Sequence, residues 1–386
     1  MGKDTRQAGH RNCFRMNKPS FPVGHGEKSG ATYLVATSFC WLEDDDSWYP
    51  QANADRMRAL REYLNCCIAS AASCRLSNPN AAIVVAVNDR SILDHTYPGS
   101  LPYLDDLGVQ LIEVPYRLFH PGISRPTRFR ASNYKFEVLH HLCQNNRIPV
   151  VCIDNDSLVL RNLEPFMRSL SSERIYLYDV YQGLETGAAG RGLSRHTLGM
   201  EFRRIDPDFP AGDPIHLGGE FFAGQPDTLL QFTEQVYYTL QRFKGSGDDA
   251  SIRMANDWSI VDGCEYLLSY VACRMSHDSW TPVPSCIIKR VWTTLSDRNA
   301  TRADLSKHAI LHLPAEKDNA LQRIARGLLA GRIDDVTGIH NVLVRHALLS
   351  DSGFGAWLHA VGRTVKRRLA MQLRKEDPSS THVKPE

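Results

Sequence analysis

The stretch "IPVVCIDNDSLVLRNLEP", residues 148–165, holds the pattern that decides the fold. Four apolar residues lead directly to two carboxylates one residue apart, Asp154 and Asp156, and a second apolar run follows at 158–160. Such a Val- and Ile-rich run predicts a buried strand. Side chains one residue apart point to opposite faces of a regular strand, so the two carboxylates converge only if the strand ends and the chain turns there.

Similar apolar runs recur along the chain and alternate with segments of helical periodicity. The predicted strands are 32–37, 81–87, 109–114, 149–153, 175–178, 220–223 and 309–313. The predicted helices are 53–72, 133–145, 226–243, 257–273 and 321–330. This alternation predicts an α/β fold with a mostly parallel sheet covered by helices on both faces. Ligands bind beyond the carboxyl ends of strands in such sheets, which is where Asp154 and Asp156 stand.

Composition narrows the class of protein. The 386 residues are enough for one large α/β domain or two ordinary ones, and a 42% apolar content supports a sizeable core. The net charge of +2 does not suggest nucleic-acid binding. The ten cysteines form no CxxC pair and lie mostly in apolar runs, which predicts reduced, buried thiols in a cytoplasmic protein. No apolar run reaches the roughly 18 residues that a membrane span needs.

The chain ends differ in composition from the centre. Residues 1–30 are polar and basic and have no apolar core for a signal peptide, so a flexible tail is predicted there. We predict a main domain at 31–320, a helical extension at 321–376 and a disordered tail at 377–386. Within 354–375, apolar residues form one stripe of a helix and Arg and Lys fill much of the rest. Such a helix can lie peripherally on an anionic membrane face or pack on its own domain.

The paired aspartates suggest a cation site. Two converging carboxylates repel each other, so an isolated pair would raise the pKa of one of them. A divalent cation removes the conflict, because Mg²⁺ or Mn²⁺ takes oxygen ligands and keeps positions open for phosphate oxygens. Such a site can hold a diphosphate and offset its charge as it leaves. The alternative is a strand-terminal turn with a capping Asp.

Two enzyme classes place a DxD pair at the end of a strand. Phosphatases of the haloacid dehalogenase type carry it after the first strand, with one Asp as nucleophile and the other as acid/base. Here at least three predicted strands precede Asp154. Nucleotide-sugar glycosyltransferases of the GT-A type instead carry the pair in mid-chain, after a nucleotide-binding half.

Residues 134–166, "YKFEVLHHLCQNNRIPVVCIDNDSLVLRNLEPF", resemble the central block of GT-A glycosyltransferases, with a basic helix residue, DxD and an apolar run ending in Asn-Leu. Three later blocks resemble GT-A segments in the expected order: "HLGGEFFAGQPDTLLQF" (216–232), "ANDWSIVDGCEYLLSYV" (255–271) and "AILHLPAEKDN" (309–319). The resemblance covers roughly 31–319. It implies a GT-A-like mixed sheet, Mn²⁺ or Mg²⁺, a nucleotide-diphosphate sugar donor such as a UDP-sugar, and a glycan or lipid-linked acceptor.

The late block has features similar to family 8, with departures. There the late His is followed by Gly and then by Lys-Pro-Trp, whereas here Pro314 and Ala315 follow, Lys317 comes one residue early and no Trp follows it. Trp258 stands where many relatives have Glu. A degenerate transferase that binds a nucleotide sugar, or only a partner protein, without catalysis is therefore a further alternative.

The resemblance implies a role for each site residue. The metal ligands would be Asp154, Asp156 and His312. The nucleotide sugar would contact Thr37, Ser38, Lys135, Asn155, Gly218, Gly219 and Lys317. The catalytic carboxylates would be Asp257 and Glu220.

Alternatives stay open for several of these. His308 is a rival to His312, although it is expected to lie before the strand, and Arg128 or Arg130 could replace the lysines. Asp257 could instead be the N-cap of helix 257–273, and the glycine pair could form a tight turn into a strand. Tryptophans 48, 258, 280 and 292 could stack on sugars or pack in the core.

Overall fold

The computed structural model describes residues 30–42, 55–122, 129–181, 193–245, 252–292 and 302–346. The predicted tails, the basic segment 354–375, Trp48 and Arg128 lie outside these residues. The predicted domain limits therefore stay predictions.

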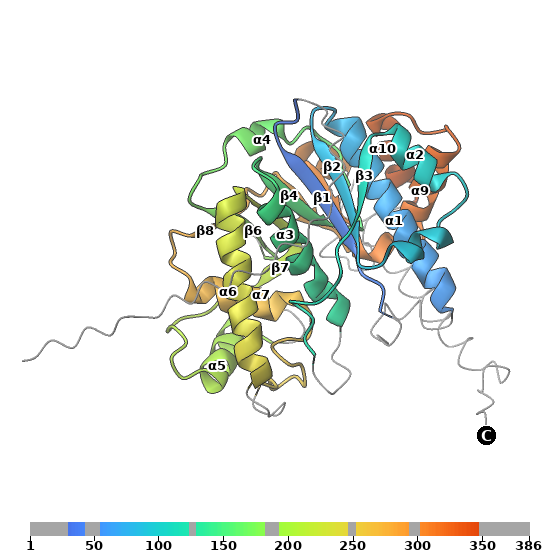
Figure 1. Cartoon of the computed structure of the whole chain (residues 1–386). Helices are drawn as coiled ribbons and strands as arrows, with labels where there is room; N and C mark the ends of the chain where they lie inside the picture. The colour runs from blue at the N-terminus through green and yellow to red at the C-terminus, as the bar shows by residue number, and fades with distance from the viewer. Residues whose placement is uncertain are drawn as a thin grey trace, which may run out of the picture.

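The described residues form one main sheet of seven strands in the order β3-β2-β1-β4-β7-β6-β8 (Figure 1). The strands are β1 (Leu34–Phe39), β2 (Ala82–Val87), β3 (Val109–Glu113), β4 (Val150–Asp154), β6 (Ile175–Asp179), β7 (Leu217–Gly224) and β8 (Trp280–Pro282). β1 to β4 run parallel to one another, β8 runs parallel to β6, and β7 is antiparallel to both β4 and β6. The predicted mixed, mostly parallel sheet is confirmed.

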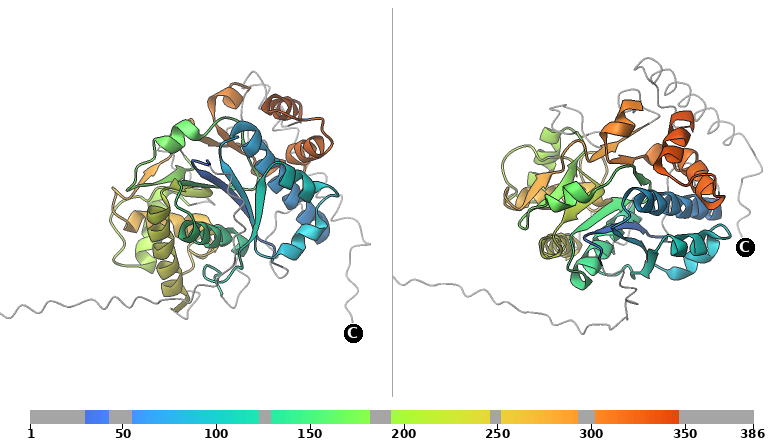
Figure 2. Two further views of the ribbon diagram at one scale, coloured as in Figure 1. Left: turned by 45° about the horizontal axis from the view of Figure 1, so that its top comes forward. Right: turned by 90° about the horizontal axis from the view of Figure 1, so that it is seen from above.

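Helices cover both faces of this sheet, as Figures 1 and 2 show. One face carries α1 (Arg56–Ser77), α2 (Ser100–Asp106), α4 (Glu164–Arg168), α9 (Ala320–Leu329) and α10 (Val336–His346). The other carries α3 (Tyr134–Asn145), α5 (Arg195–Ile205), α6 (Pro226–Gly245) and α7 (Cys264–Arg274). We call these the α1 layer and the α3 layer.

Each strand divides its side chains between the two layers. On β1, Leu34 and Ala36 pack into the α3 layer, whereas Val35 and Phe39 pack into the α1 layer. Because both faces of the sheet are buried, no polar face is needed, and the strands are nearly continuous apolar runs. This explains why their sequences predict buried strands so directly.

The cysteines belong mainly to these cores. Seven of the nine cysteines in the described residues are buried and all nine are free thiols. Burial raises the pKa of Cys67 and of Cys74, both on α1, to about 12, so they remain protonated thiols. Cys286 differs, since it is exposed.

A smaller three-stranded sheet stands beside the main one. It has the order β5-β10-β9, with β5 (Ser157–Val159), β10 (Ile310–His312) and β9 (Ile288–Arg290). β10 is antiparallel to β5 and parallel to β9. Since β5 directly follows the turn after β4, this sheet brings the late part of the chain to the paired aspartates.

Two local predictions are wrong. The helix predicted at 257–273 begins only at Cys264, and Asp257 is not its N-cap. Residues 252–262 instead form a short turn closed by a bridge between Arg253 and Ser259, with Asp257 near its tip at φ 62°. Helix α5 lies where no element was predicted, although Ser194 caps its first turn and Leu198 and Phe202 form a buried i, i+4 pair.

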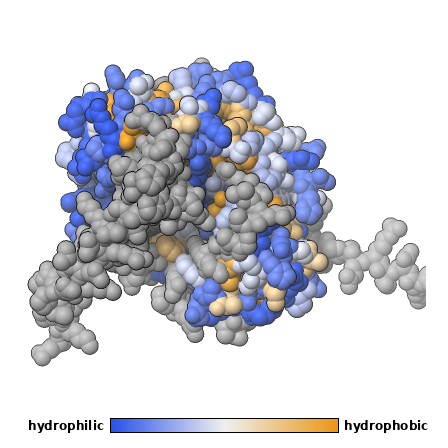
Figure 3. Space-filling model, turned by 180° about the vertical axis from the view of Figure 1, so that it is seen from behind, coloured by the Kyte–Doolittle hydropathy of each residue, from blue (hydrophilic) through white to orange (hydrophobic). Residues whose placement is uncertain are grey.

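The remaining short elements of the described residues are α8 (Arg302–Lys307) and the 3₁₀ turns at Arg90–His95, Arg130–Asn133 and Pro314–Glu316. On the face drawn in Figure 3, hydrophobic residues occur in small groups among polar ones. Within the described ranges, every helix is too short or too polar to cross a membrane.

Asp206 ties three helices of the α3 layer together. It is the C-cap of α5, and its buried carboxylate accepts hydrogen bonds from Arg242 of α6 at 2.9 Å, from Arg274 of α7 at 2.5 Å and from the Tyr270 hydroxyl. Burial alone would raise its pKa, but the hydrogen bonds from Arg242 and Tyr270 and the arginine charges lower the pKa to about 2.

We expect Asp206→Asn to lower the free energy of unfolding by about 2 kcal/mol at about pH 7, because charged hydrogen bonds are lost. The unfolded carboxyl has a pKa of about 4. The folded pKa is lower, so the stabilisation is complete above about pH 4 and is lost as the pH falls towards about 2. Urea unfolding of both proteins across this range checks it, and a difference independent of pH would contradict the ionic role.

Candidate metal and diphosphate site

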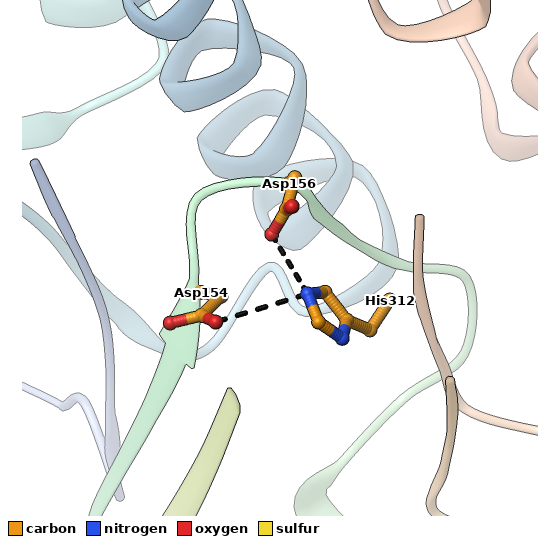
Figure 4. A group of neighbouring side chains, drawn as sticks. All are labelled: Asp154, Asp156 and His312. Carbon is orange, nitrogen blue, oxygen red and sulfur yellow. Dashed lines mark ion pairs between the residues drawn. The ribbon is translucent and has the colours of Figure 1, made fainter. Parts of the chain in front are cut away.

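The two aspartates converge because the strand ends between them. β4 ends at Asp154, residues 155 and 156 form a turn, and β5 begins at Ser157. Figure 4 shows both carboxylates facing the imidazole of His312. Nε2 of His312 lies 3.0 Å from Asp156 Oδ1 and 3.7 Å from Asp154 Oδ2. The strand therefore ends in a turn at this point, as the predicted convergence of the two carboxylates requires.

His312 reaches this place through the smaller sheet. In the antiparallel register of β10 and β5, His312 stands opposite Ser157, directly after Asp156. The backbone N–H of Leu313 donates to the carbonyl of Asp156 at 2.9 Å and fixes the two segments together. His308 lies before β10, as expected, where its Nδ1 stands 2.8 Å from the Ser285 carbonyl.

The three side chains make a donor set that fits a divalent cation. One ligand atom from each of Asp154, Asp156 and His312 lies within 4.8 Å of the other two. Two carboxylate oxygens and one imidazole nitrogen are donors that Mn²⁺ accepts, and Mg²⁺ takes the oxygens. These residues could therefore hold such an ion.

Each aspartate also forms an ion pair with a lysine. The buried Lys135 of α3 places Nζ 2.5 Å from Asp154 Oδ1 and 2.5 Å from the Gly219 carbonyl. Burial alone would lower the pKa of Lys135, but the charge of Asp154 and its hydrogen bond, together with Cys264 and Glu220, raise the pKa. Lys317 donates to Asp156 Oδ2 and stands 5.5 Å from the centre of the Tyr63 ring. Two positive side chains thus stand beside the two acids.

The charges keep the cluster ionised. Burial alone would raise the pKa of Asp156, but the charges of Lys317 and His312 hold this pKa well below its usual range. Burial would lower the pKa of His312, but Asp156 and Glu220 raise it to about 9. The protonated imidazole thus supplies positive charge at the position where a cation would sit.

Glu220 lies behind His312 in a buried charge network. Its carboxylate accepts from Arg290 Nε and Nη2, both at 2.5 Å, and Arg290 Nη2 also donates to Glu265 at 2.6 Å. Burial would raise the pKa of Glu220, but Arg290 and His312 lower it to about 2. Sequence reasoning missed Arg290 and Glu265, because β9 has only three residues and Glu265 reads as an ordinary first-turn helix residue.

An irregularity in β7 positions Glu220. Tyr178 of β6 pairs with Gly218, whereas the preceding Leu177 pairs with Phe222, so β7 bulges over three residues. The bulge brings the Gly219 carbonyl to Lys135 and the Glu220 side chain to His312. The glycines lie inside the strand, so the alternative of a tight turn into a strand is wrong.

Side chains crowd the two glycines. A Cβ at Gly219 would lie 2.1 Å from Cys264 Sγ and 3.1 Å from Lys135 Nζ, and one at Gly218 would lie 2.1 Å from Glu220 Oε2. Both positions therefore need glycine because protein groups already occupy the space.

We expect Gly219→Ala to destabilise the fold by about 2 kcal/mol, since an added methyl group overpacks the site. Most of this cost should disappear in Gly219→Ala/Cys264→Ala, in which the clashing sulfur is gone. Thermal unfolding of the two single variants, the double variant and the parent completes the cycle. Additive effects would contradict the assigned contact.

The other predicted nucleotide contacts, Ser38, Thr37 and Asn155, lie in different surroundings. Ser38 pairs in register with Asp154 on the neighbouring parallel strand, at the same sheet edge. Thr37 is buried and its hydroxyl has no hydrogen-bond partner among the described residues. Asn155 is buried beside the Cys67 thiol of α1, whose pKa it lowers in part. Ser38 and Asn155 thus both stand beside the cluster, whereas the Thr37 hydroxyl is buried in the sheet.

Asp257 is not joined to the cluster. It is exposed on its turn, and no contact with Asp154, Asp156 or His312 occurs in the described part of the chain. The neighbouring Trp258 stacks on Phe129, with ring centres 5.8 Å apart, and Trp280 packs in the core. Arg130, the alternative phosphate ligand, is buried.

Comparisons with known proteins find only distant similarities to solved structures. No family model and no curated protein matches it. Mouse xyloside xylosyltransferase 1 is similar at 12% identity and a TM-score of 0.42, over 74% of this chain and 98% of that one. The galactosyltransferase LgtC, in complex with donor and acceptor sugar analogs, is similar at 12% identity and a TM-score of 0.45, over 78% and 95%. The bifunctional glycosyltransferase WbbM is similar at 12% identity and a TM-score of 0.42, over 77% of this chain and 46% of that one.

Proposed function

We propose that this protein is a metal-dependent glycosyltransferase that moves a sugar from a nucleotide-diphosphate sugar, in particular a UDP-sugar, to an acceptor hydroxyl. The observation that carries the proposal is the convergence of Asp154, Asp156 and His312 at the carboxyl edge of a mostly parallel sheet. The two lysines beside them supply the positive charge that a diphosphate needs.

The position of each site residue indicates its proposed role. Asp154, Asp156 and His312 would hold Mn²⁺ or Mg²⁺, which when bound offsets charge on the leaving diphosphate. Lys135 and Lys317 bind phosphate oxygens as point charges, and Ser38 lies where the nucleoside would extend along the sheet edge. Asp257 stays a predicted catalytic carboxylate, and Glu220 is treated below.

The phosphatase alternative is not favoured by the site. Its acid/base carboxyl must carry a proton near neutral pH, whereas Lys317 and His312 hold the pKa of Asp156 far below that range. Asp154 also ends a strand that follows three others of the same sheet along the chain.

The proposed acceptor is a glycan or lipid-linked hydroxyl at the cytoplasmic membrane face. The reason is the basic composition of 354–375, which suits an anionic surface. Cosedimentation of the full chain with anionic and with neutral vesicles tests this. Equal recovery with anionic and with neutral vesicles would contradict the membrane part of the proposal and leave the sugar-transfer part intact.

Thermal unfolding with nucleotide sugars, with and without Mn²⁺, tests the function itself. A UDP-sugar at about 100 times its Kd should stabilise the fold by about 2.7 kcal/mol, and only when the metal is present. Slow UDP release without acceptor would exclude the inert binder, and phosphate release from a small phosphoester without nucleotide would favour the phosphatase. No shift with any nucleotide-diphosphate sugar and either metal would overturn the proposal.

A further inference from the structure

We infer that Glu220 is a positioning residue for His312, and that Arg290 and Glu265 hold Glu220 in place for this role. The inference rests on the proposed function, because it assigns His312 to a metal site. It replaces the expectation that Glu220 is a catalytic carboxylate.

The two nitrogens of His312 face different partners. Nε2 faces the aspartates, at 3.0 Å from Asp156 and 3.7 Å from Asp154. Nδ1 lies 3.4 Å from Glu220 Oε1, at ion-pair distance, and makes no hydrogen bond in the part of the chain that the structure describes. A histidine that binds a metal through one nitrogen commonly presents the other to a carboxylate, which sets the tautomer and the ring orientation. Glu220 occupies that place.

Glu220 cannot itself reach a substrate in this arrangement. Its side chain has no exposed surface, and both of its oxygens accept from Arg290. A general base must come within hydrogen-bond distance of the hydroxyl that it deprotonates. The carboxylate therefore acts through the imidazole.

The register of the smaller sheet keeps the parts together. Arg290 and His312 are paired residues of the parallel strands β9 and β10. The backbone N–H of Arg290 donates to the Tyr178 hydroxyl at 3.1 Å, next to the bulge that carries Glu220. Arg290 also reaches Glu265, whose other oxygen lies 3.3 Å from His216 Nε2. The network thus spans β6, β7, β9 and α7, and it ends at His312.

Mn²⁺ binding to the full-length protein tests the inference, measured by electron paramagnetic resonance with UDP present. Glu220→Gln keeps the shape of the side chain. Its amide has one acceptor oxygen, whereas the carboxylate has two, and both of these face Arg290 or Nδ1 of His312. We expect about 10- to 100-fold weaker Mn²⁺ binding. The visible spectrum of the Co²⁺-loaded protein should also change, since the imidazole is no longer oriented.

Asp206→Asn is the matched control. It also neutralises a buried carboxylate that pairs with arginine, in a cluster made of other residues. It should lower stability and leave Mn²⁺ affinity at the parent value.

Arg290→Lys provides a second, independent variant, because lysine removes the fork that holds Glu220. It should weaken Mn²⁺ binding as well, and it decides the question if the Glu220 variant does not fold. Parent-like Mn²⁺ affinity in the folded variants, whatever their stability, would overturn the inference alone. Absence of Mn²⁺ binding by the parent protein with UDP would overturn the proposed function, and the inference with it.

Discussion

Asp154→Asn is expected to lower kcat/KM for UDP release from a UDP-sugar by about 1,000-fold, because a ligand that helps offset several kcal/mol of leaving-group charge is lost. The Asp154 side chain is 29% exposed but pairs with the buried Lys135, so the isosteric amide should also lower the free energy of unfolding, and the kinetics are compared on folded protein. The variant also frees Lys135 from its ion pair, which leaves one cation without its partner near the phosphates. Steady-state kinetics over a range of Mn²⁺ concentrations measures the loss.

Asp89→Asn is the control for this change. Asp89 follows β2, which lies two strands from β4 in the same sheet, and it is exposed and caps a 3₁₀ turn by accepting from the Ser91 N–H. The control should turn over at the parent rate. Parent-like turnover by Asp154→Asn with unchanged Mn²⁺ dependence would remove Asp154 from the site.

Lys317→Gln should change two affinities in opposite directions. In the ligand-free protein the ammonium holds Asp156, so a cation must displace it, and its removal should tighten Mn²⁺ binding by about tenfold, or 1.4 kcal/mol. The same substitution removes a positive charge from the phosphates, so UDP at saturating Mn²⁺ should bind about tenfold more weakly. Calorimetric titration with Mn²⁺ alone, and then with UDP, separates the two effects.

Lys289→Gln offers a comparable lysine away from the cluster. Lys289 pairs with Asp304 at 3.0 Å, and neither residue touches the metal cluster. Its loss should change neither affinity. If Lys317→Gln weakened both ligands together, the displacement of the lysine by a cation would be wrong, and Lys317 would act as a general source of positive potential.

Much of the fold could be predicted because both faces of the sheet are buried. Runs such as 82–87 and 150–153 have few polar interruptions, so their strand character depends on local sequence alone. The convergence of Asp154 and Asp156 was likewise a local matter, since it required only a turn after the strand. The identity of His312 as their neighbour came from the order of the blocks along the chain.

The missed parts of the site depend on tertiary structure. Arg290 sits on a three-residue strand, too short for a periodic pattern, and its role appears only when β9 pairs with β10. The need for Gly219 follows from the approach of Cys264, and the late start of α7 follows from the turn around Asp257. None of these contacts is visible to a reading that treats each segment separately.

The smaller sheet gives the site a fixed order of assembly during synthesis. A growing chain that has emerged as far as β7 already carries both aspartates, Lys135 and the bulged strand, but neither His312 nor Lys317. These two arrive with β10 and the turn after it, which dock on a strand made much earlier. A ribosome-bound fragment that ends before β10 therefore lacks two of the groups proposed to bind metal and diphosphate, and the proposed function implies that ligand binding begins only once β10 pairs with β5.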